Sequence, residues 1–161
     1  MSIHDSPRYP TRKRIRLAPQ SYAQPGTISS VTVAVRHRRP VFASPTLAQA
    51  AVDVLRTHAG KTGVSVHGYC VMPDHVHLVI EPSPGCDITT FIGQFKNLAQ
   101  RAAWKHGVAG AFWQQSFWDH FLRAAEQVER VLEYVLSNPV RRGLVEQWRD
   151  YPFSGSLVWE L

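Results

Sequence analysis

The feature of the sequence that most constrains the fold is the run Pro73-Asp74-His75-Val76-His77-Leu78-Val79-Ile80. Its apolar, β-branched residues predict a strand. Side chains two positions apart share one face of a strand, so His75 and His77 stand side by side, while Val76, Leu78 and Ile80 face a core. Two imidazoles on a rigid strand can hold a divalent metal through two nitrogens. Taken alone, such a pair is more often a surface or hydrogen-bonded pair than a metal site.

The hydrophobic pattern on either side of this run predicts one α+β domain. The expected elements are a strand at 27–35, a helix from Ser44-Pro45 to Gly60, strands at 64–72 and 75–81 joined by a tight turn, a helix capped by Asp87, and a strand within 112–123. This order is the split βαβ arrangement of ferredoxin-like domains, with an antiparallel sheet. An additional C-terminal helix carries Tyr134.

Length and composition limit the class of protein. The chain has 161 residues, enough for one domain with a core, and no apolar run as long as a membrane span. We expect a flexible basic tail at 1–26 and a single folded domain at 27–161. The tail lacks the apolar segment of a secretory signal, and two cysteines do not make a disulfide framework. A reducing cytoplasm is therefore the expected location.

The chain is basic, with a net charge of +6, and residues 1–24 contain five basic residues and one acid. Such a tail suits a polyanion such as nucleic acid, and it is equally compatible with a solvated arm. The helix after Asp87 is expected to bury Ile88, Phe91, Ile92, Phe95, Leu98 and Ala102, with its basic residues on the other side. The candidate DNA contacts are Arg12, Lys13, Arg14, Arg16, Arg36, Arg38, Arg39, Lys96, Arg101, Lys105, Arg141 and Arg142.

The last predicted helix places two polar residues away from its apolar stripe. That stripe consists of Val128, Val131, Leu132, Val135 and Leu136. Tyr134 lies about 120° from the stripe centre, and Asn138 follows one turn later on nearly the same face. A tyrosine hydroxyl can attack a phosphodiester, and a divalent metal can neutralise the phosphate charge as a Lewis acid. Tyr134 is thus a candidate nucleophile, and Asn138 is a candidate third ligand beside His75 and His77.

At this point several motifs resemble one family, the REP-associated tyrosine transposases, which are relatives of the single-tyrosine insertion-sequence transposases. His75-Val76-His77 resembles the HUH motif, in which U is a hydrophobic residue. The segment from Leu132 to Val145 is similar to the signature Tyr-x-x-x-Asn-Pro-Val-basic-x-Gly-Leu. The stretches 71–75, 113–120 and 151–154 also match the family pattern, and the resemblance covers residues 27–156.

The resemblance implies a bacterial enzyme that cleaves and transfers single-stranded DNA at hairpin-flanked, palindromic elements. Tyr134 would form a 5′-phosphotyrosine link and leave a free 3′-hydroxyl. His75, His77 and Asn138 would hold Mg²⁺ or Mn²⁺. The expected partner is hairpin DNA, the expected location is the nucleoid, no membrane is involved, and the protein acts as a monomer or a homodimer.

Two other readings stay open at this stage. A non-catalytic DNA- or RNA-binding module would use the same ferredoxin-like fold, its aromatic residues and its basic tail, and its binding would survive removal of divalent metal. A structural zinc site could instead combine Cys70, His75, His77 and Cys86, whose side chains suit zinc although their spacing matches no zinc finger or ribbon.

Overall fold

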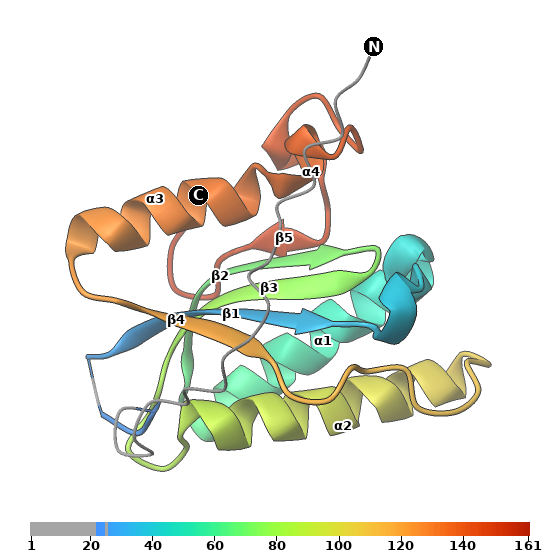
Figure 1. The fold of residues 1–161 in the computed structure, drawn as a ribbon, viewed down its shortest axis with the longest axis horizontal. Helices are drawn as coiled ribbons and strands as arrows, with labels where there is room; N and C mark the ends of the chain where they lie inside the picture. Colours follow the sequence, from blue (N-terminus) through green and yellow to red (C-terminus); the bar gives the residue numbers. More distant parts are fainter. Residues whose placement is uncertain (1–21, 25) are drawn as a thin grey trace.

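The computed structural model describes residues 22–24 and 26–161 (Figure 1). Most of the predicted tail, including Arg12, Lys13, Arg14 and Arg16, lies outside the described residues. The packed part begins earlier than predicted, because Tyr22 is buried and its ring lies 5.4 Å from that of Phe121. The backbone N–H of Gly26 also donates to the Glu81 carboxylate at 3.0 Å.

Five strands form one antiparallel sheet in the order β4-β1-β3-β2-β5. The strands are β1 (Ile28–Ala34), β2 (Ser65–Met72), β3 (His75–Glu81), β4 (Trp118–Leu122) and β5 (Ser154–Gly155). The first four, with their two helices, have the connectivity and order of the ferredoxin-like split βαβ fold. The predicted fold class is therefore confirmed, with β5 as an added edge strand.

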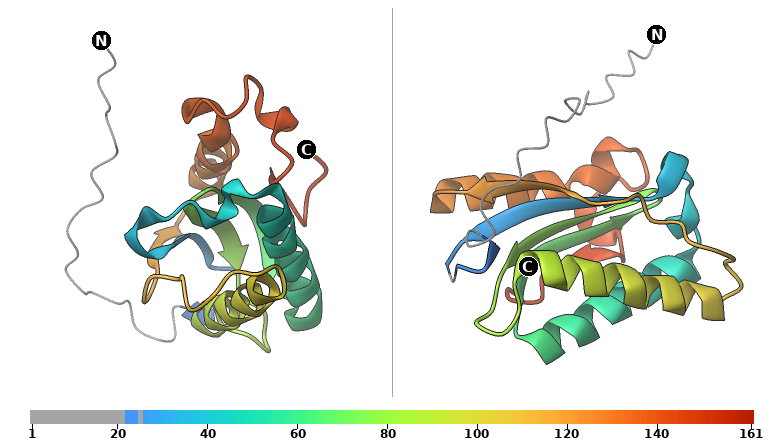
Figure 2. Two further views of the ribbon diagram at one scale, coloured as in Figure 1. Left: turned by 90° about the vertical axis from the view of Figure 1, so that its right-hand side faces the viewer. Right: turned by 60° about the horizontal axis from the view of Figure 1, so that its bottom comes forward.

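Helices cover both faces of this sheet (Figures 1 and 2). The helices α1 (Pro45–Thr62) and α2 (Ile88–Lys105) pack side by side on one face. On the other face lie α3 (Ala125–Leu136) and the short α4 (Asn138–Arg141). Short 3₁₀ turns occupy Arg36–Arg38, Val41–Ala43 and Trp148–Asp150. Among the described residues, no helix has the length and apolar character needed to cross a lipid bilayer.

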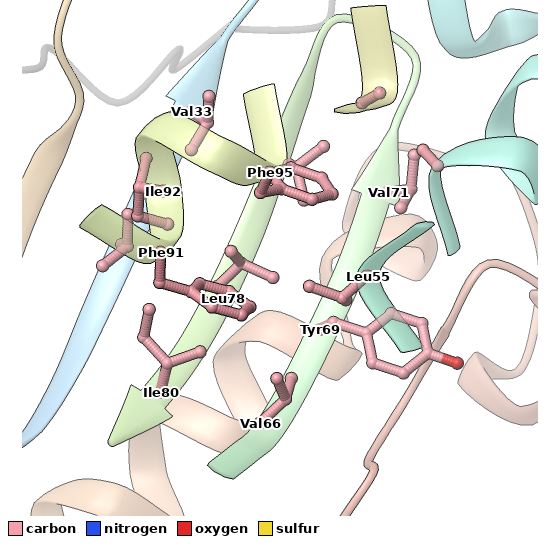
Figure 3. Packing of buried hydrophobic residues seen from close by; sticks show 14 of the residues in the cluster. Val33, Leu55, Val66, Tyr69, Val71, Leu78, Ile80, Phe91, Ile92 and Phe95 are labelled. Atoms are coloured by element: carbon pink, nitrogen blue, oxygen red, sulfur yellow. The ribbon is translucent and has the colours of Figure 1, made fainter. Parts of the chain in front are cut away.

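The alternation along β3 divides its side chains between two apolar layers. Val76, Leu78 and Ile80 are fully buried in the larger core, against α1 and α2 (Figure 3). His75, His77 and Val79 point to the opposite face, which α3 covers. The sequence-predicted orientation of the histidine pair is thus confirmed.

The smaller layer fixes the position of α3 on the sheet. Val135 and Leu136 are buried. Val128, Val131 and Leu132 pack against the cluster of buried side chains to which Cys70, Met72 and Val79 belong. Helix α3 approaches β2 closely at Gly68, where an added Cβ would lie 2.4 Å from Leu132 Cδ2. Gly68 follows an irregularity in the β2–β3 register after Val66. The predicted apolar stripe of α3 is therefore confirmed.

The structure corrects two helix predictions. Helix α1 passes through Gly60 and ends three residues later at Gly63, whose φ of 75° is the left-handed conformation that favours glycine. In α2 the buried residues include Ala99 and Ala103, whereas Leu98 is 38% exposed and Ala102 is only partly buried. The reason is Gln100, which is buried because its amide donates to Gly110 O at 2.7 Å and accepts from Phe112 N at 2.9 Å.

Candidate active site

The site begins with the two histidines of β3. Their Nε2 atoms lie 3.0 Å apart, and the ring planes meet at 85°. His75 is 2% exposed and His77 is 5% exposed, so water has little access to either ring. The strand therefore holds two imidazole nitrogens against each other under the cover of α3.

The second nitrogen of each ring has its own partner. His75 Nδ1 lies 2.6 Å from Asp74 Oδ1, and His77 Nδ1 lies 3.0 Å from the hydroxyl of Thr32 on β1. An ionised carboxylate only accepts hydrogen bonds, so His75 Nδ1 carries the proton and its Nε2 is bare. This is the arrangement by which proteins orient histidines that ligate metals.

Burial keeps both rings neutral. It lowers the pKa of His75 more than the Asp74 hydrogen bond and charge raise it. Burial, together with the nearby His75 and Arg141, lowers the pKa of His77 to about 3. Neutral imidazole is the form that binds metal ions. Both histidines therefore stay in the ligating state at neutral pH.

Asn138 approaches the two histidines from the helices that cover this face of the sheet. It follows the turn at Ser137 that ends α3, and it is 7% exposed. Its side-chain nitrogen Nδ2 lies 3.4 Å from His75 Nε2. An amide group presents its oxygen in the same place after a flip, because the two orientations have almost the same shape. The structure thus brings together the three predicted ligands, from segments 63 residues apart.

These three residues fit a divalent metal. The two Nε2 atoms lie 3.0 Å apart, so both could face one divalent ion in place of the hydrogen bond that now joins them. The two facing Nε2 atoms, with the Asn138 amide 3.4 Å from that of His75, supply a converging set of neutral donors. Among the described residues, the histidines, cysteines and acids alone form no group of three placed for a metal, so the amide is needed.

Tyr134 stands at the edge of this site. Its ring centroid is 6.4 Å from that of His77, and its side chain is 48% exposed, as expected for a residue away from the apolar stripe. The guanidinium of Arg141 lies over the ring at 3.9 Å. Arg141 also donates to the Tyr134 carbonyl oxygen at 2.7 Å and to the Ser137 hydroxyl. An accessible phenol is therefore held beside the buried histidines.

The predicted basic residues separate into distinct groups. Arg38, Arg141 and Arg142 lie at the site, and Arg38 and Arg142 approach the Asp74 carboxylate at 3.8 and 3.6 Å. Arg36 and Arg39 are exposed in the adjoining turn. Lys96 donates to the carbonyl oxygens of Gln114 and Ser116, at 2.7 and 3.2 Å. Arg101 and Lys105 line a groove of about 590 Å³ between α1 and α2, on the other face of the sheet.

The four-ligand zinc reading is not supported by the fold. Cys70 lies opposite His77 in the β2–β3 register and belongs to the smaller apolar layer. Cys86 belongs to the larger core, on the other side of the sheet. The two cysteines therefore do not share a site.

Sequence reasoning missed Asp74 and Thr32. Asp74 was assigned only to a turn, although its position next to His75 was a usable signal. Thr32 reaches His77 because the two residues pair across β1 and β3, a register that the sequence does not state. Tyr151 is a second tyrosine on the same side of the sheet as the histidines. Unlike Tyr134, it is unsuited to nucleophilic attack, because its hydroxyl is buried and donates to Val71 O at 2.5 Å.

The amino-acid sequence of this chain is similar to those of known proteins. The family model described as IS200-like transposase matches residues 27–138. A candidate REP-associated tyrosine transposase of Haemophilus influenzae is 30% identical over an alignment of 97 residues, and the match covers 53% of this chain and 54% of that protein. A REP-associated tyrosine transposase of Escherichia coli K12 is 28% identical over 89 residues, 55% of this chain and 52% of that one. The chain thus spans about half the length of the curated relatives it matches.

Two solved structures share the fold. One is a REP-associated tyrosine transposase bound to a REP hairpin, with a TM-score of 0.68 and 24% identity, covering 83% of this chain and 78% of that one. The other is a candidate transposase from Deinococcus radiodurans R1, with a TM-score of 0.52 and 23% identity, covering 67% of this chain and 87% of that one. At sequence identities of 24% and 23%, these two matches establish similarity of fold alone.

Proposed function

Since the chain belongs to the IS200-like transposase family, we propose that it cleaves and rejoins single-stranded DNA beside hairpin-forming sequences, with Tyr134 as the nucleophile. The observation that carries this proposal is the convergence of His75, His77 and Asn138 beside an accessible tyrosine. The Nε2 atoms of the two neutral imidazoles face each other, and the Asn138 amide lies next to His75 Nε2, so the three side chains offer a divalent ion converging neutral donors.

The proposed reaction exchanges one phosphate ester for another. The Tyr134 hydroxyl oxygen attacks the phosphorus and loses its proton to solvent, the bond from phosphorus to the 3′ oxygen breaks, and that oxygen takes up a proton. The downstream strand stays attached to Tyr134 through its 5′ phosphate as a phosphotyrosine, the upstream strand leaves with a free 3′-hydroxyl, and attack by a 3′-hydroxyl on this linkage reverses the step and joins the strands. His75, His77 and Asn138 would hold a divalent cation, which as a Lewis acid would stabilise the charge on the phosphate.

The choice of cation follows from the donor set. Mg²⁺ strongly prefers oxygen ligands, whereas two of the three donors here are imidazole nitrogens. Mg²⁺ and Mn²⁺ are both candidates, and we expect the site to bind Mn²⁺ more tightly than Mg²⁺. A metal titration followed by electron paramagnetic resonance of free Mn²⁺ would measure it, with Mg²⁺ as the competitor.

The DNA partner is proposed from a relative. The REP-associated tyrosine transposase that shares the fold was solved with a REP hairpin. Palindromic hairpins are therefore the substrates to test first on this chain. The three arginines beside the site, Arg38, Arg141 and Arg142, give that edge a positive potential suited to a phosphate backbone.

The test is denaturing electrophoresis of labelled hairpin DNA incubated with protein and Mn²⁺. Wild type should yield a covalent protein–DNA adduct, and Tyr134→Phe should yield none while still binding DNA. The ring is kept and the side chain is half exposed, so the stability of this variant should change by less than about 0.5 kcal/mol. Adduct in Tyr134→Phe would place the nucleophile elsewhere. Binding without adduct or metal dependence in wild type would favour the non-catalytic binding module.

One chain holds both halves of the site, which supports catalysis in cis. His77 and Tyr134 come from the same molecule and lie 6.4 Å apart between ring centroids. A mixture of His77→Ala and Tyr134→Phe proteins should therefore be inactive. Recovered cleavage in the mixture would mean that two copies exchange their tyrosines, as a homodimer.

A further inference from the structure

We infer that Asp74 is a positioning residue of this site, whose carboxylate fixes the His75 tautomer that leaves Nε2 free for a metal ion. The use of that nitrogen rests on the proposed function. The tautomer itself is a property of the protein without metal, so the two ideas can fail separately.

The assignment depends on which neighbour His75 Nδ1 serves. Asp74 Oδ1 lies 2.6 Å away and can only accept, whereas an Arg38 nitrogen lies 3.5 Å away and can only donate. The two contacts demand opposite tautomers. The shorter one is a hydrogen bond to a charged group, and the longer one is at the limit of hydrogen-bond distance. The carboxylate therefore decides that the proton is on Nδ1.

Asp74 is itself fixed from several directions. Its carbonyl oxygen accepts from Val35 N at 2.9 Å, which ties the β2–β3 turn to the end of β1. Arg38 and Arg142 lie 3.8 and 3.6 Å from the two carboxylate oxygens. Burial alone would raise the pKa of Asp74, but the His75 hydrogen bond and the charges of the two arginines hold it below its usual value. Two of the basic residues predicted to contact DNA thus also contact the carboxylate that orients His75.

His77 lacks such control, because its partner is a hydroxyl. Thr32 Oγ1 can donate to His77 Nδ1 or accept from it. With His75 Nε2 bare, the His77 Nε2–H can donate to it across 3.0 Å, and Thr32 then donates to His77 Nδ1. A metal ion in that place would need the other His77 tautomer, which rotation of the Thr32 hydroxyl accommodates. Asp74 therefore sets the direction of hydrogen bonding through both rings.

Nitrogen NMR of the metal-free, ¹⁵N-labelled protein tests this inference directly, because the shifts of the two imidazole nitrogens report which one carries the proton. Wild-type His75 should be protonated on Nδ1. In Asp74→Asn, whose amide can donate, and in Asp74→Ala, where only Arg38 still faces Nδ1, the proton should move to Nε2. A role in folding alone would leave the tautomer unchanged.

The chain offers a matched control in a second carboxylate–imidazole pair. His67 Nε2 lies 2.9 Å from Glu81 Oε2 on the same two strands, away from the site. Glu81→Gln should alter the His67 signals and leave His75 unchanged.

A second readout is Mn²⁺ affinity, which should fall about 10- to 100-fold in Asp74→Asn, as is typical when the partner of a ligating histidine is lost. Protonation of wild-type His75 on Nε2, or an unchanged tautomer in both Asp74 variants, would overturn the inference even if the enzyme cleaves DNA. If neither variant folds, the wild-type spectrum alone decides. Wild-type protein with the expected tautomer but no Mn²⁺ binding would instead refute the metal part of the proposed function.

Discussion

At the scale of single residues, the decisive fact is that His75 and His77 are buried although they face away from the larger core. Their face of β3 is covered by α3, so each ring has lost its water and depends on protein partners. The cost of desolvation is offset by Asp74 and Thr32 on the outer nitrogens. The inner nitrogens share one hydrogen bond, from His77 Nε2–H to His75 Nε2, which a bound metal ion would replace.

Replacing His77 with Ala should therefore affect both stability and metal response. Without metal, the loss of a buried, hydrogen-bonded ring should lower the free energy of unfolding by about 1–3 kcal/mol. Mn²⁺ at about 100 times its dissociation constant should stabilise wild type by about 2.7 kcal/mol and the variant hardly at all. Thermal melts with and without Mn²⁺ measure both effects, with Tyr134→Phe as the control that keeps the response. An equal Mn²⁺ response in His77→Ala would remove this residue from the ligand set.

At the scale of elements, the site depends on how closely α3 lies against the sheet. Helix α3 supplies Tyr134, and Asn138 follows its last turn, whereas the histidines come from β3. The contact of Leu132 with β2 is close because Gly68 has no side chain. A larger side chain at position 68 should therefore push α3 away from the sheet, and this shift should displace Tyr134 and Asn138 relative to the histidines.

Gly68→Ala should test this coupling. The new methyl group meets Leu132 Cδ2, so the variant should lose about 1–3 kcal/mol of stability and cleave DNA more slowly. Leu132→Ala makes space for that methyl group, so the double variant should be more stable than the sum of the two single losses predicts. Urea unfolding of all four proteins gives the interaction free energy. Strict additivity would show that the two positions do not meet.

At the scale of the whole molecule, the positive charge is unevenly placed. Residues 1–24 hold five of the 18 basic residues, whereas Arg38, Arg141 and Arg142 lie beside the site. Arg101 and Lys105 lie on the opposite face of the sheet, and Lys96 is bound to two carbonyl oxygens. A DNA strand engaged by the site would meet Arg38, Arg141 and Arg142 directly. Further phosphate contacts would come from the exposed Arg36 and Arg39 in the adjoining turn and from the N-terminal segment.

Salt dependence can separate these contributions. Each lysine or arginine that contacts a single-stranded phosphate adds about 0.7 to the slope of log affinity against log salt. Changing Arg12, Lys13, Arg14 and Arg16 to Ser in the full chain should reduce that slope by up to about 3 and leave cleavage of saturating DNA unchanged. Fluorescence anisotropy with labelled hairpin DNA measures the slope, with Arg101→Ser as a control on the far face. An unchanged slope would mean that the tail does not contact DNA.

The sequence by itself was sufficient for everything that depends on local periodicity. The alternation at 75–80 placed both histidines on one face, the 3.6-residue period placed Tyr134 off the apolar stripe of α3, and the order of elements identified the ferredoxin-like fold. The same period placed Asn138 one turn after Tyr134 as a candidate third ligand, and the family motifs agreed with that assignment. These features are properties of neighbouring residues, so no knowledge of distant contacts was needed.

The tertiary structure alone decided what depends on contacts between distant segments. It ended α1 at Thr62, whose carbonyl oxygen accepts a hydrogen bond of 2.6 Å from the hydroxyl of Ser83, 21 residues away in the chain. It buried Gln100 in place of Leu98, because the amide bonds to the loop at 110–112. It also brought Thr32 to His77 through strand register, and Arg38 and Arg142 to Asp74 through the packing of a turn and a helix end. Hydrogen bonds of this kind join residues far apart in the chain, and no local pattern of the sequence encodes them.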